Sequence, residues 1–169
     1  MANKAFGGIT TKILTDLNRA GMSGNLNYEP ANDTEKWIYR EIIIDSTSTA
    51  LLQAGIQYEG SIRTDEAEKE IATGDKVKWI VIKHTGTSDG TAATSEGVVI
   101  SLAASGSAAF NEVEGIFIDS GDIWMGKLPA TTCNDIGAIT VTVANGSPSE
   151  AGAADVLVQV AAVIDDVDA

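Results

Sequence analysis

The feature that most constrains the fold is a series of short runs rich in Val, Ile, Thr and aromatic residues, each bounded by Gly, Ser, Asp or Asn. In residues 139–143 the apolar side chains of Ile139, Val141 and Val143 alternate with Thr140 and Thr142. Strict alternation of this kind predicts an antiparallel strand with one buried face. Residues 156–164 carry apolar side chains at every second position in the same way. The sequence therefore predicts a series of strands joined by turns.

Six further runs have the composition of strands, which favour β-branched and aromatic residues. They are residues 36–44, 55–62, 76–83, 97–102, 115–118 and 123–128. Within the run 76–83, residues 77–82 are apolar apart from Lys78, which suits a strand buried on both faces. Residues 85–96 form the longest polar connector and predict a flexible surface loop, while residues 65–70 can form one helical turn. Residues 36–169 are thus expected to be an all-β domain, a sandwich or jelly roll of about eight strands.

The first 35 residues differ from the rest and predict an N-terminal arm, extended or partly helical. Several Gly residues and a run of Asn and Asp argue against a long regular element. Ile9, Ile13, Leu14 and Leu17 nevertheless have the spacing of one helical face. A helix of about three turns is marginal alone, so the arm is expected to order on its own core, on a neighbouring subunit or on a partner. These four residues are the candidate anchors.

Charge excludes two classes of partner. The 169 residues suit one domain or one domain with an arm, and 11 Lys and Arg against 24 Asp and Glu give a net charge of −13. Such a chain repels phosphate backbones and anionic lipids, so we expect no nucleic-acid and no membrane partner. Residues 1–84 are nearly balanced, whereas residues 85–169 hold a single basic residue, Lys127. This asymmetry suggests one region that docks and one that stays in water.

Neither a targeting segment nor a membrane span is apparent in the sequence. The first twenty residues lack the apolar core of a signal peptide, and no run of about 20 apolar residues occurs. We therefore expect synthesis and folding in a cytoplasm, where Cys133 stays reduced.

Catalytic and metal chemistry find little support. Cys133 and His84 are the only Cys and the only His, so no disulfide and no thiolate zinc cage can form within the chain. A Cys133–His84 pair would need an electropositive setting, and its surroundings are acidic. No phosphate-binding glycine motif is present. We expect no enzyme activity, no metal and no cofactor, although abundant carboxylates leave a glycosidase pair formally open.

Two acidic segments and three tryptophans have alternative interpretations. Asp119 and Asp122 could bind a cation, but Asp-Ser-Gly-Asp is more typical of a tight turn. The carboxylates of the acidic tail could bind a cation in the same way: Asp165, Asp166 and Asp168. Three tryptophans could stack on sugars, although their strand-like settings favour the core: Trp37, Trp79 and Trp124.

Four segments carry a resemblance to a known class of protein. Residues 71–87, 97–102, 115–118 and 124–129, in this order, resemble small virion structural proteins of tailed bacteriophages that decorate or cement the head. The likeness covers residues 71–143 and is one of motif order, with no family site to carry over.

This resemblance implies a noncatalytic, all-β capsid decoration protein. It would lie on the virion exterior after synthesis in the host cytoplasm, bridging subunits of the major capsid protein as a homo-oligomer, with a trimer favoured. The alternative is a head-fibre or tail-associated module that binds host-surface glycans.

Overall fold

The computed structural model describes residues 5–12, 21–28, 35–47, 49–56, 58, 70–102, 115–128 and 139–166, the first two ranges and residue 49 by backbone alone. The chain divides into two compact units, Met1–Asp33 and Thr34–Ala169. No helix occurs among the described residues, and hence none that could cross a membrane.

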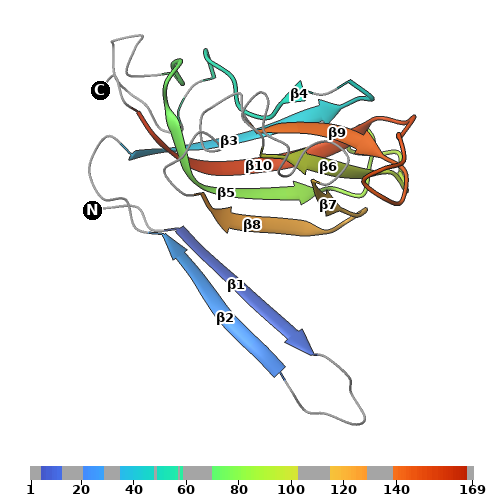
Figure 1. Cartoon of the computed structure of the whole chain (residues 1–169), viewed down its shortest axis with the longest axis horizontal. Coiled ribbons are helices and arrows are strands. Elements are labelled where there is room, and N and C mark those ends of the chain that lie inside the picture. Colours follow the sequence, from blue (N-terminus) through green and yellow to red (C-terminus); the bar gives the residue numbers. More distant parts are fainter. Residues whose placement is uncertain are drawn as a thin grey trace. The chain divides into compact units, whose positions relative to one another are not determined.

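The second unit is built from two four-stranded sheets in which all pairs are antiparallel (Figure 1). The first has the order β3 (Glu35–Ile44), β10 (Val156–Asp165), β5 (Lys76–His84) and β8 (Ile123–Lys127). The second has the order β4 (Thr49–Ala50), β9 (Thr140–Ala144), β6 (Gly97–Ser101) and β7 (Ile116–Ile118). The expected all-β, sandwich-like fold is confirmed.

A single core joins the two sheets. Alternate residues of the central strand β10 enter it, as do Ile80 and Ile82 of β5 and Val98 and Ile100 of β6. The predicted alternation of residues 139–143 is confirmed, because its three aliphatic residues are buried and its two threonines are half-buried.

Strand β5 is covered on both faces over most of its apolar run. Trp79 and Ile80, on opposite faces, are buried, Val81 is half-buried, and Lys83 beyond the run is exposed. A register shift opposite β10 makes Lys78 an extra residue, so that both of its neighbours, Val77 and Trp79, stay paired with β10.

The first unit contains an antiparallel hairpin of β1 (Ala5–Lys12) and β2 (Gly21–Tyr28), which form a sheet of their own. Four glycines lie within these strands, whose ladder hydrogen bonds need only the backbone: Gly7, Gly8, Gly21 and Gly24. Ile9 lies in β1. Ile13, Leu14 and Leu17 lie outside the described residues, so the helical spacing is not tested there.

Two further expectations differ from the structure. The two-residue strand β4 carries no recognisable strand signal, and it forms because Thr49 and Ala50 meet β9. The strand expected at residues 55–62 is wrong at its described start, where Gly55 takes a turn conformation with φ +88°. Residues 65–69 of the expected helical turn lie outside the described part.

Candidate interaction surface

The side of the β3-β10-β5-β8 sheet turned away from the core carries an apolar surface, here named the outer sheet face. Three large hydrophobic side chains are exposed in the described residues: Tyr39 at 48%, Ile43 at 53% and Ile123 at 55%. All three alternate with core-facing neighbours and so lie on this face. The outer sheet face consists of Trp37, Tyr39, Glu41, Ile43, Val81, Lys83, Ile123, Met125, Lys127, Leu157, Gln159 and Ala161. Trp79 and Val163 lie on the same side of the sheet but are buried.

Strand register divides this face into a polar row and an apolar area. Glu41, Gln159 and Lys83 are paired across β3, β10 and β5. Gln159 Nε2 donates to Glu41 Oε1 at 2.8 Å, and Tyr39 Oη donates to the same oxygen at 3.1 Å. The next outward row is Tyr39, Ala161, Val81 and Met125, which is apolar apart from the tyrosine hydroxyl.

An aromatic pair ends the apolar area. The rings of Trp37 and Trp79 meet edge to face, with centroids 5.7 Å apart and planes at 75°. Trp79 is only 3% exposed, and its buried Nε1–H has no acceptor among the described residues. Trp124 packs against the core from the inner side. A sugar platform built on all three tryptophans is therefore wrong, since they do not share an exposed surface.

The described charges are unevenly placed. Every described Lys and Arg of the second unit lies on a strand of this sheet: Lys36, Arg40, Lys76, Lys78, Lys83 and Lys127. Register brings the connections 45–47, 85–96, 119–122 and 145–155 to one end of the sandwich, on the right in Figure 1. The described residues of these connections contain no Lys or Arg but hold Asp45, Asp89, Glu96, Asp119, Asp122, Glu150 and Asp155. We call this region the acidic loop end.

The segment Asp119–Asp122 at this end is a turn. Ser120 N donates to Asp119 Oδ1 at 2.7 Å, Asp122 N donates to the Asp119 carbonyl at 2.9 Å, and Gly121 has φ +83°. The turn interpretation is confirmed. No group of three or more His, Cys, Asp or Glu placed to hold a metal occurs in the described part of the chain.

His84 is a structural residue at the base of the acidic loop end. Its side chain is fully buried, Nδ1 accepts from Gly86 N at 2.9 Å, and Nε2 lies 2.8 Å from the Glu96 carbonyl oxygen. Both ring nitrogens are occupied by backbone, which assigns the neutral tautomer with hydrogen on Nε2. Cys133 lies outside the described residues, so the Cys–His pair is not tested, but this His84 has no nitrogen left for a nucleophile.

We expect acid to destabilise the fold through His84. Burial lowers its pKa below 6.5, although the Glu96 carbonyl and the charges of Asp119 and Asp122 oppose this shift. The unfolded chain then binds more protons than the folded one just below pH 6.5, so the free energy of unfolding falls with decreasing pH until the folded pKa is passed. Urea unfolding at pH 7.5 and 5.5 measures this. In His84→Gln the drop should shrink; an equal drop in both proteins would refute the assignment.

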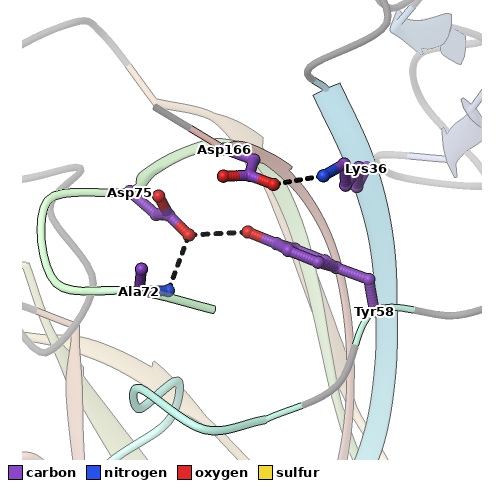
Figure 2. A network of polar contacts seen from close by, with 5 residues as sticks. All are labelled: Lys36, Tyr58, Ala72, Asp75 and Asp166. Carbon is purple, nitrogen blue, oxygen red and sulfur yellow. Dashed lines mark hydrogen bonds and ion pairs between the residues drawn. The ribbon is translucent and has the colours of Figure 1, made fainter. Parts of the chain in front are cut away.

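A buried polar network closes the opposite end of the sandwich (Figure 2). Asp75 Oδ2 accepts from Tyr58 Oη at 2.7 Å and from Ala72 N at 2.8 Å. Lys36 at the start of β3 pairs with the buried Asp166, and its Nζ lies 5.3 Å from the centre of the Tyr58 ring. Burial, followed by the hydrogen bond to Asp75, raises the pKa of Tyr58 well above 10. The network is a clamp that holds residues 58 and 70–75 against β3 and β10.

Two carboxylates of the acidic tail form ion pairs with lysines. Asp166 pairs with Lys36, and Asp165 pairs with Lys78 at 2.9 Å between Oδ2 and Nζ. These two carboxylates are neutralised by lysines, which disfavours the cation site considered from sequence. Asp168 lies outside the described residues.

Comparison with protein-family models, with curated proteins and with solved structures found no match.

Proposed function

We propose that the protein is a noncatalytic virion structural protein that decorates the head of a tailed bacteriophage. It would bind the outside of the shell and bridge neighbouring subunits of the major capsid protein, as a homo-oligomer. This proposal rests on the resemblance in residues 71–143 and on the charge distribution of the second unit.

The observation that carries the proposal is the separation of the described charges. In the second unit, one sheet holds all the described Lys and Arg and the exposed large apolar side chains, and the described residues of the acidic loop end hold seven carboxylates without a Lys or Arg. A protein that covers a larger particle needs one surface that loses water and another that keeps the particle dispersed. The outer sheet face suits the first role and the acidic loop end the second.

Charge also distinguishes the N-terminal unit. Residues 1–33 contain three basic and three acidic residues, so the net charge of −13 belongs entirely to residues 34–169. A neutral hairpin can approach an acidic neighbour without the repulsion that two sandwiches would meet. An isolated two-stranded hairpin is marginal in water, and packing against a shell subunit would stabilise it.

Co-sedimentation with phage heads that lack the protein tests the function. We expect saturable binding to expanded heads, at a copy number set by the lattice, and an increase in the temperature at which the heads disrupt. Unexpanded heads are the comparison, since a decoration protein adds to a finished shell. Failure to bind either form would overturn the proposal.

Removing residues 1–33 should reduce binding to heads at least ten-fold while leaving the sandwich folded. The reason is that residues 1–33 form a compact unit of their own, and that the two sheets of the second unit pair their strands without the hairpin. Far-ultraviolet circular dichroism and thermal unfolding control for folding. Unchanged occupancy of the truncated protein on heads would show that the arm is not the shell contact.

Glycan binding by a head fibre or tail module is the second candidate. The observation in its favour is that exposed Tyr39 and half-buried Trp37 lie two residues apart on the outer sheet face. Aromatic rings placed in this way can stack on sugars. Titration of the tryptophan fluorescence with host-surface glycans tests it, with Tyr39→Ala as the variant expected to lose the response.

A further inference from the structure

We infer that the outer sheet face is the contact between two copies of this chain, packed face to face about a two-fold axis that runs along β10. This inference needs no shell protein. It assigns the outer sheet face to self-association within the homo-oligomer, so that the shell contact of the proposed function falls to the N-terminal unit. Its occupant is a second copy, and the arguments are self-complementarity, local charge and size.

Self-complementarity follows from the strand order, which can be followed in Figure 1. Because β10 lies between β3 and β5, a two-fold axis along β10 places β3 of one copy over β5 of the other. Residues of one row then meet residues of the same row. Glu41 faces Lys83 of the second copy, and Lys83 faces the second Glu41, since both belong to the row centred on Gln159.

The apolar rows match under the same operation. Tyr39 meets Val81 of the second copy, and Ala161 meets its own equivalent across the axis. Small and half-buried side chains at the centre allow the two sheets to approach to about 10 Å, the usual spacing of packed sheets. Tyr39, 48% exposed in the single chain, would lose most of its contact with water.

Charge selects this face over the rest of the described surface. Two chains of net charge −13 repel each other, and the acidic loop end would bring carboxylate against carboxylate. On the outer sheet face Glu41 is the single described acid, and Lys83 and Lys127 accompany it. Lys83 is exposed and makes no ion pair within the described part of the chain, and Glu41 uses one oxygen for Tyr39 and Gln159. The remaining oxygen can therefore take the lysine of a second copy.

Size sets the expected strength. With the axis along β10, three strands of each copy overlap, β3, β10 and β5, so the rows from Trp37 to Ile43 cover about 14 Å by about 24 Å at standard strand spacings. This is below the area of a standard interface, so the dimer should be weak, with a dissociation constant in the micromolar range. It should also be salt-sensitive, since two of its central contacts are ion pairs.

A charge-swap cycle on the full-length chain tests the contact. Sedimentation equilibrium should show the mass of two copies above about 100 μM and dissociation on dilution, as a micromolar constant requires. Glu41→Lys and Lys83→Glu should each raise the dissociation constant at least ten-fold, because each sets like charges opposite each other twice. The double variant E41K/K83E should return it to within about three-fold of the original.

Matched controls separate this from a general effect of charge. Glu150→Lys changes the net charge as Glu41→Lys does, but at the acidic loop end, and should not weaken the dimer. Circular dichroism checks that each variant folds. A monomer at all concentrations, the mass of three copies, or single variants that are not rescued in combination would each overturn the inference. A dimer whose dissociation constant is unchanged in both charge-reversal variants would also overturn the inference. The hairpin would then be the candidate contact between the two copies.

Discussion

Replacing Gly152 with alanine should lower the free energy of unfolding by about 3 kcal/mol, the upper end of the usual range for overpacking. A Cβ atom at this position would lie 2.3 Å from Val143 Cγ1, 2.6 Å from Glu96 Oε2 and 2.9 Å from Ala144 N. The last is backbone of β9 and cannot rotate away. Gly152 N also donates to the Val143 carbonyl at 3.2 Å, so the clash would separate a bonded pair. Urea unfolding measures the loss.

Gly121→Ala is the matched control for this prediction. Nothing lies within 4 Å of a Cβ atom at Gly121, but its φ of +83° disfavours any side chain. Its expected loss is therefore the backbone penalty alone, about 1 kcal/mol. If the two variants lost the same stability, close packing against β9 would not be the reason for glycine at position 152.

Replacing Asp75 with alanine should cost about 3 kcal/mol of folding free energy, because a buried donor that loses its acceptor is expensive. Asp75 is fully buried, and Tyr58 Oη and Ala72 N would both lose the oxygen that accepts from them. The variant should also lower the pKa of Tyr58 relative to the native protein, since Asp75 raises it by hydrogen bonding and by charge. Burial, the larger cause, remains. Denaturation and an ultraviolet titration of tyrosine measure the two effects.

Two further variants test whether the clamp is the cause. Tyr58→Phe keeps the bond from Ala72 N to Asp75 and should lose about 1 kcal/mol, the value of one hydrogen bond. Asp155→Ala removes an exposed carboxylate at the acidic loop end and should change stability by less than about 0.5 kcal/mol. A loss in Asp75→Ala no larger than in Asp155→Ala would mean that the clamp does not stabilise the fold.

Most of the sandwich was predictable because its strands have a local cause. Seven of the expected runs coincide with β3, β5, β6, β7, β8, β9 and β10 to within two residues at either end. Each has β-branched or aromatic residues and is bounded by turn residues, and both signals act over a few residues. Strand β4 has no such signal, because its two residues are placed by β9. The run 55–62 had the signal, but its described start turns at Gly55.

The clamp and the outer sheet face were not predictable, because each depends on residues far apart in the sequence. Lys36 and Asp166 are separated by 130 positions, and no local sequence pattern around either residue predicts their contact. The sequence predicts only that Tyr39 and Lys83 lie in two separate strands. They lie on one face only because β10, near the end of the chain, pairs between β3 and β5.

Local sequence is enough to predict that the second unit is β-structure, which of its residues alternate toward a core, and that the chain is acidic. These properties follow from side-chain periodicity and composition, which need no long-range contact. Tertiary structure alone decided which strands are neighbours, which carboxylates are neutralised by lysines, and where the exposed apolar side chains gather. Pairing order and register decide those features, and they result from the packing of the whole core rather than from any one segment.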